Sequence, residues 1–202
     1  MAENRYSLVG WLAIANAGIF PLAIVLNIVF AVVSAKLLGF YEPTFGPGDI
    51  LSVVSTVIMI YILIKFKQLL HEHYQYGGID GLIIASIIWN IAFEIGGIFL
   101  RVVQIGLGTG RDAEIFVAIL SIAFLCVAVV SIGIIDIIIA VKLLTIKEQV
   151  GDAMKVFIYL NLVLGILEVS IVLSPVSLLL TPVMFIVFGI VFLRDKEQIQ
   201  FV

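Results

Sequence analysis

The sequence is poor in charged residues, which make up only 12% of its 202 positions. A soluble domain has roughly 25%. The chain is also 63% hydrophobic, with a mean hydropathy of +1.28. A globule of this size has too much surface to hide so much apolar material from water. The composition therefore excludes an ordinary soluble protein and predicts an all-α, polytopic transmembrane helix bundle whose main partner is the lipid bilayer.

Cysteine, histidine and clustered basic residues are equally scarce. The single cysteine, Cys126, allows no intramolecular disulfide and no CxxC site. A net charge of −3 without Lys/Arg clusters gives no reason to expect nucleic-acid binding. The two histidines, His71 and His73, are only a weak metal candidate, because a four-coordinate site needs more ligands.

Recognisable catalytic patterns are missing as well. No histidine falls inside a predicted span, so a haem between helices and a histidine base for Cys126 or a membrane serine are not expected. The chain contains no GxSxG, GxGxxG or Walker-type glycine pattern. We therefore expect neither an enzyme nor a bound cofactor.

Long apolar runs are what the sequence does contain, and a helix needs about 20 such residues to cross the hydrocarbon. Pro21 is expected to kink the first run, and Ser174–Pro175 separates the last two only weakly. Glycine and proline near 39–48, 77–78, 106–110 and 151 mark the other connections. The sequence thus predicts one membrane domain over residues 1–202, with six spans at about 8–38, 50–70, 79–105, 115–144, 156–173 and 176–193.

The basic residues divide unevenly between the two sides of these six spans. Positive charge favours the cytoplasmic side, so a cell-membrane protein with both termini in the cytoplasm is expected. Eight fall on one side: Arg5, Lys65, Lys67, Lys142, Lys147, Lys155, Arg194 and Lys196. Three fall on the other: Lys36, Arg101 and Arg111.

Two alternatives remain open at this point. Val33–Ser34–Ala35 has the small residues of a signal-peptidase site, although the apolar run before it is longer than a usual signal sequence. The second and third spans also resemble the fourth and fifth, because each pair has a basic connection followed by a helix with an Asn and a Glu. A parallel duplication would explain this likeness, and so would the positive-inside bias alone.

Polar residues inside the spans are the candidate site. Such groups are costly in lipid and usually face protein or water. At 100° per residue, Asn90, Glu94, Arg101 and Gln104 share one face of their span beside Trp89, and Glu94 and Arg101 could pair across two turns. The intramembrane polar core is predicted to comprise Asn16, Asn27, Asn90, Glu94, Arg101, Asp136, Asn161 and Glu168.

Two functions fit this polar core. In the favoured interpretation, these side chains hold a non-catalytic bundle in register. The chain would then be an accessory or scaffold subunit beside other membrane subunits or further copies of itself. In the alternative, Glu94 and Glu168 serve a small solute or ion transporter coupled to protons. A carboxyl group in a low-dielectric surrounding keeps its proton to a higher pH than in water, which suits such coupling.

Overall fold

The computed structural model describes residues 6–38, 45–107 and 111–194, and within these ranges the side chains of 34–38, 107 and 111–114 lie outside the described part. No strand occurs among the described residues, so the all-α class is confirmed. Every helix except α5 is long and apolar enough to cross a membrane, which marks a multi-pass membrane protein. The helices are α1 (Ser7–Leu38), α2 (Pro47–Tyr74), α3 (Asp80–Leu107), α4 (Arg111–Leu144), α5 (Asp152–Val169) and α6 (Ser174–Arg194).

The helix ends differ in places from the predicted spans. Pro47 belongs to α2 rather than to the preceding connection, since proline suits the first turn of a helix. Pro21 and Pro182 lie inside α1 and α6 without ending them. The fifth helix begins at Asp152 instead of residue 156 and ends four residues early, so it is separate from α6. Of the predicted breaks, Gly106 lies within α3, while residues 39–44 and 108–110 are outside the described part.

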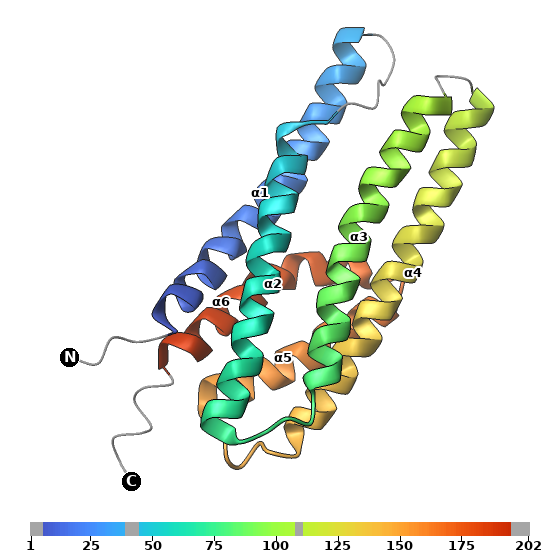
Figure 1. Cartoon of the computed structure of the whole chain (residues 1–202). Helices are drawn as coiled ribbons and strands as arrows, with labels where there is room; N and C mark the ends of the chain where they lie inside the picture. The colour runs from blue at the N-terminus through green and yellow to red at the C-terminus, as the bar shows by residue number, and fades with distance from the viewer. Residues whose placement is uncertain (1–5, 39–44, 108–110, 195–202) are drawn as a thin grey trace.

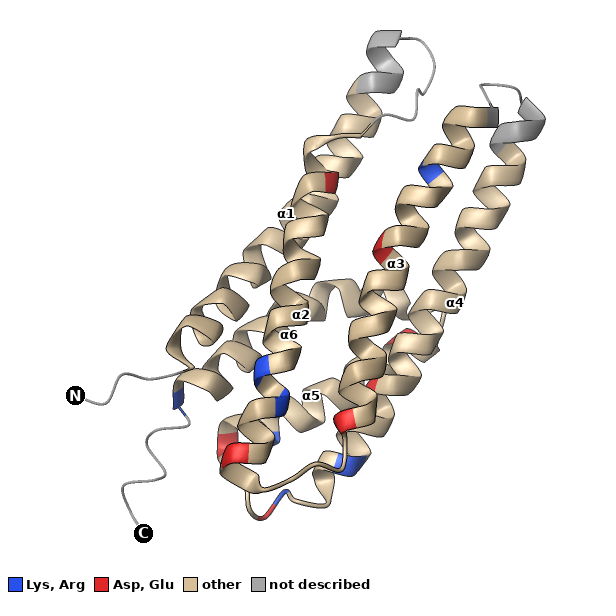
Figure 2. Cartoon of the chain, in the orientation of Figure 1, with Lys and Arg blue, Asp and Glu red and all other residues tan. Residues whose placement is uncertain are grey.

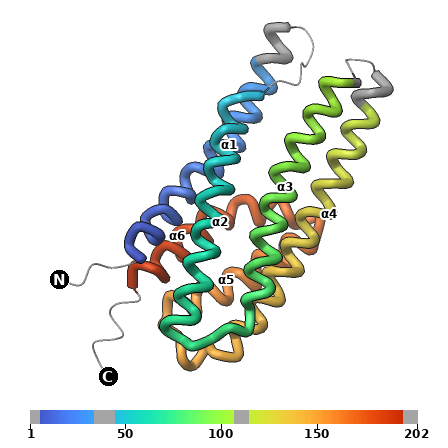
Figure 3. The backbone as a smooth tube through the Cα atoms, in the orientation of Figure 1, coloured from blue at the N-terminus to red at the C-terminus, as the bar shows by residue number. Residues whose placement is uncertain are grey.

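The six helices form a closed ring in chain order (Figures 1 and 3). Each helix packs against the next one along the chain, and α6 packs back against α1. The first residues of α1 and the last residues of α6 therefore lie at the same end of the bundle. This arrangement leaves the centre of the ring lined by all six helices.

Two glycine pairs let neighbouring helices approach closely. A Cβ on Gly10 of α1 would come within 2.9 Å of the Gly189 carbonyl oxygen of α6. A Cβ on Gly165 of α5 would come within 2.7 Å of the Gly133 carbonyl oxygen of α4. Small residues serve the same purpose in other membrane bundles. Among the described residues, α2 and α3 meet at no such glycine pair. The duplication of the α2–α3 and α4–α5 hairpins, one of the two explanations that the sequence leaves open, therefore gains no support from these contacts.

One end of the bundle, here called the charged end, carries most of the described charges (Figure 2). Lys67 and His71 of α2 both contact the Asp80 carboxylate at the start of α3, at 3.2 and 2.8 Å. The Lys142 ammonium donates to the Gly78 carbonyl at 2.9 Å. These contacts hold the connections at the charged end together. At the far end the described charges are few.

The helices α5 and α6 are shorter than the others, and α5 ends and α6 begins near the middle of α4 (Figure 1). Val169, the last residue of α5, lies against Gly133, since a Cβ on Gly133 would come within 3.0 Å of the Val169 nitrogen. From Gly133, α4 continues 22 residues further, back to Arg111, which is about 33 Å at 1.5 Å per residue. The tip between the two helices, residues 170–173, consists of one serine and three apolar residues, and its Val172 is 87% exposed.

Candidate functional site

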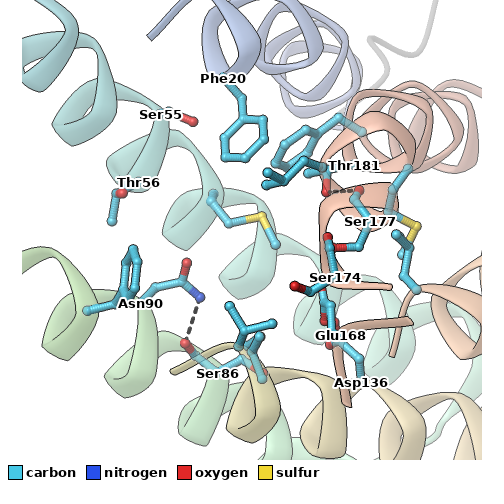
Figure 4. Close-up of a pocket in the computed structure, with 18 of the residues that line it drawn as sticks. Phe20, Ser55, Thr56, Ser86, Asn90, Asp136, Glu168, Ser174, Ser177 and Thr181 are labelled. Atoms are coloured by element: carbon cyan, nitrogen blue, oxygen red, sulfur yellow. Dashed lines mark hydrogen bonds between the residues drawn. The ribbon is translucent and has the colours of Figure 1, made fainter. Parts of the chain in front are cut away.

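A cavity of about 560 Å³ occupies the centre of the ring, and every one of the six helices contributes to its wall. Pockets of roughly 300–1,000 Å³ are the usual size for small-molecule ligands. Apolar side chains dominate the lining, and a minority of polar groups is spread over all sides (Figure 4). The polar lining residues are Asn27, Ser52, Ser55, Thr56, Ser86, Asn90, Glu94, Cys126, Asp136, Asn161, Glu168, Ser174, Ser177 and Thr181.

Aromatic rings from three helices cluster at the part of the cavity nearer the charged end. The ring centroids of Phe66 and Phe188 are 4.9 Å apart, and those of Phe157 and Phe188 are 4.5 Å apart. The ring of Phe192 stacks on the ring of Phe188, with their centroids 5.4 Å apart. Because these rings come from α2, α5 and α6, they pack three helices of the ring against one another.

Glu94 stands on the wall formed by α2 and α3. Its Oε2 accepts hydrogen bonds from Thr56 Oγ1 at 3.1 Å and from Ser52 Oγ at 3.3 Å. Asn90, one turn earlier on α3, lines the same wall and donates to the Ser86 carbonyl at 2.8 Å. Of the predicted polar stripe on this helix, Asn90 and Glu94 line the cavity and Arg101 and Gln104 are not among the lining residues, while two hydroxyls of α2 donate to Glu94 Oε2.

Asp136 of α4 and Glu168 of α5 stand on the opposite wall, close enough for their charges to interact (Figure 4). Asn161 donates to the Asp136 backbone carbonyl at 2.8 Å and so ties α5 to α4. The Oε2 atom of Glu168 is buried and finds no hydrogen-bond partner among the described residues. Buried polar atoms are rarely left unpaired, so this oxygen is suited to receive a proton or a ligand.

Arg101 is paired with a residue that the sequence did not suggest. Its guanidinium contacts both carboxylate oxygens of Asp49 on α2, at 2.6 and 2.5 Å. Glu94, which the spacing would allow to pair with Arg101, accepts hydrogen bonds from the α2 hydroxyls instead. Asp49 also accepts from the Gly46 nitrogen at the start of α2, at 2.7 Å. This bidentate pair joins α2 to α3 toward the far end, with Arg101 about two turns after Glu94 and Asp49 about one turn before Ser52.

The remaining predicted polar residues divide between the cavity and other places. Asn27 lines the cavity, whereas Asn16 is fully buried and its amide atoms have no hydrogen-bond partner among the described residues. His71 contacts Asp80, and the ring of His73 packs edge-on against Tyr6. No group of three His, Cys, Asp or Glu side chains suited to hold a metal ion is found in the part of the chain that the structure describes.

Several cavity residues were missed because they look ordinary in the sequence. Serine and threonine are common in membrane helices, where they can bond their own backbone. Here Ser177 and Thr181 each donate to a carbonyl one turn earlier, yet both also line the cavity. The signal that could have found them is the spacing of Ser174, Ser177 and Thr181, which places them along one side of α6.

With this geometry established, we compared the chain with protein-family models, curated proteins and solved structures, and none matches.

Proposed function

We propose that this chain is a small membrane carrier that binds a solute in the central cavity and couples its movement to protons. The observation that carries the proposal is a ligand-sized cavity walled by all six helices, with carboxyl groups on opposing sides. A bundle held in register by its polar residues would need no such space. Of the two functions expected from the sequence, the cavity favours transport over a scaffold role.

Proton coupling would use the carboxyl groups of the cavity. The titratable groups among its described lining residues are Glu94, Asp136, Glu168 and Cys126. Ionisable groups at membrane depth commonly mark proton or ion pathways. We assign no catalytic role, because no histidine stands among the described lining residues to activate Cys126 or a serine.

We propose that the charged end faces the cytoplasm, with the chain in the cell membrane. Described basic side chains gather at that end (Figure 2), where α4 and α6 finish with Lys142 and Arg194 in their last turns, whereas Arg101 lies near the opposite end of α3. Positive charge favours the cytoplasmic side. Both ends of the described chain would then be cytoplasmic. The predicted positions Arg5, Lys36, Arg111 and Lys196 have side chains outside the described part.

We further propose that α5 and α6 form a hairpin that enters and leaves through the cytoplasmic face, in place of two full crossings. Between the tip of this hairpin and the far end of the bundle, α3 and α4 still expose apolar side chains such as Ile95, Phe99 and Ile119. The hydrocarbon layer of the bilayer would therefore extend past the tip. Irregular backbone at membrane depth is tolerated where it adjoins a cavity. In a Cys126→Ser background, a charged thiol reagent should then fail to label Val172→Cys, and labelling at the rate of an exposed loop would place the tip in water.

Flux through purified protein in liposomes tests the carrier function. With a pH-sensitive dye inside the vesicles, cationic, neutral and anionic solutes are added in turn. At least one class is expected to drive proton movement. Glu94→Gln is expected to abolish this flux without unfolding the protein, because glutamine keeps an acceptor for Ser52 and Thr56 but cannot carry a proton.

A matched control is Glu148→Gln, since Glu148 is exposed at the charged end. This variant should transport like the wild type. Normal flux in Glu94→Gln would make Glu94 structural, and an absence of flux with all three solute classes would contradict the carrier function.

An accessory or scaffold subunit remains the second candidate. It rests on the minimal connections and on the lack of a catalytic constellation. The described glycine pairs Gly10–Gly189 and Gly133–Gly165 are used inside the chain, so they offer no surface to a partner. Stable purification as a monomer with solute flux would contradict this role, and co-purification with a stoichiometric membrane partner without flux would support it.

A further inference from the structure

We infer that the solute of the central cavity is an organic cation with an apolar body. This inference rests on the proposed function for its physiological meaning, although binding can be measured without transport. Four features of the cavity support it: the sign of its charges, its unpaired polar atoms, its aromatic lining and the separation of its acidic groups.

The charged groups of the cavity are all acidic. Glu94, Asp136 and Glu168 line it, and no Lys, Arg or His stands among the described lining residues. The nearest described guanidinium along α3, that of Arg101, is already engaged by Asp49. Charge complementarity selects against wrong partners at a site of one sign. An anionic solute would meet uncompensated repulsion, whereas a cation would neutralise the carboxylates.

Two buried side-chain oxygens of the cavity lining have no hydrogen-bond partner among the described residues. Glu168 Oε2 has none among the described residues, and neither has the Oγ of Ser86, whose side chain is only 3% exposed. The two residues come from α5 and α3, on opposing walls of the cavity (Figure 4). Leaving a buried polar group unsatisfied costs about 1–3 kcal/mol. A ligand with a positive, hydrogen-bonding group would relieve this cost.

The rest of the lining fits an apolar ligand body. Aromatic faces attract cations, most strongly where water is excluded, and the sulfur of Met59 and Met184 adapts to irregular shapes. A bare metal ion fits less well, because no group of three ligating side chains converges in the described residues. The phenylalanines of the lining are Phe20, Phe66, Phe93, Phe157, Phe185 and Phe188.

A pair of ions that differ in charge but hardly in shape provides the test. Tetraphenylphosphonium and tetraphenylborate are offered to the purified full-length chain in detergent, with triethylammonium as a smaller cation that carries an N–H donor for the unpaired oxygens. Binding is measured by equilibrium dialysis against empty micelles. We expect saturable binding of at least one cation, no competition by the borate anion, and about a tenfold or greater loss of affinity in Glu168→Gln.

Glu148→Gln serves as the control and should bind the cation like the wild type, because Glu148 is exposed outside the cavity. Thermal unfolding of each variant shows whether it is folded, and Asp136→Asn gives a second test if Glu168→Gln is unstable. Binding of neither cation, equal binding of the borate, or unchanged affinity in both cavity variants would overturn the inference. Cation binding without liposome flux would instead contradict only the carrier function, and flux of neutral or anionic solutes alone would contradict only the cation assignment.

Discussion

Filling the cavity by Ser86→Phe is expected to reduce solute binding by about a hundredfold or more, equivalent to roughly 2.7 kcal/mol. Ser86 is buried on α3, and its hydroxyl reaches the cavity without a partner among the described residues. A phenyl ring added there would occupy space that a ligand needs, between the wall of Asn90 and the opposing Glu168 (Figure 4). The affinity of whichever solute drives flux in liposomes, measured by dialysis, checks this result.

The matched control for cavity filling is Ile84→Phe, two residues earlier on α3. Ile84 is 47% exposed on the outside of the bundle, so an added ring there meets lipid. This variant should bind like the wild type. Asn90→Phe, one turn from Ser86, provides a second obstruction if Ser86→Phe unfolds at lower temperature. Undiminished binding in both cavity variants would mean that the ligand does not occupy this space.

Removing the guanidinium of Arg101 is expected to cost about 2 kcal/mol of stability. The pair with Asp49 is bidentate and only partly exposed, and breaking a shielded pair leaves one charge uncompensated in the membrane. α2 and α3 are joined by this pair and, on the wall of the cavity, by the hydroxyl contacts of Glu94. Arg101→Ala should therefore lower the midpoint temperature of unfolding in detergent. Arg101→Lys should lower it less, since lysine keeps the positive charge but cannot form the two parallel hydrogen bonds of a guanidinium group.

The control for this pair is Lys155→Ala. Lys155 contacts Asp152 at 3.5 Å, but both side chains are well exposed at the charged end. Exposed ion pairs contribute little, roughly 0–1 kcal/mol. An equal loss in Lys155→Ala and Arg101→Ala would show that the Arg101–Asp49 pair has no special role.

The class of fold and the direction of one polar face could be predicted because both depend on local chemistry. Apolar runs of about 20 residues predict membrane helices from composition alone. The 100° repeat likewise placed Asn90 and Glu94 on one face of α3, and both line the cavity. At 100° per residue Asn16 and Asn27 also share one face of α1, yet of the two only Asn27 lines the cavity. A helical repeat shows which residues share a face but does not show what that face contacts.

The rest depends on contacts between helices. Asp49 stood at the edge of a predicted connection, and only the packing of α2 on α3 makes it the partner of Arg101. Gly133 and Gly165 lie on different helices, so no small-xxx-small pattern within one helix reveals their contact. The end of α5 near the middle of α4 was also hidden, because hydropathy measures the length of an apolar run and carries no information about its depth.

The most direct test of a solute-accessible central cavity uses the protein's single cysteine. Cys126 of α4 lines the cavity and is half-buried. A cationic, water-soluble methanethiosulfonate reagent is added to the protein in liposomes, with Val172→Cys in a Cys126→Ser background as the lipid-exposed control. If solutes reach the cavity, Cys126 should be labelled faster by the cationic reagent than by an anionic one. Ser86→Phe should slow this labelling, and the control should stay unlabelled. A Cys126 as unreactive as the control would contradict the account.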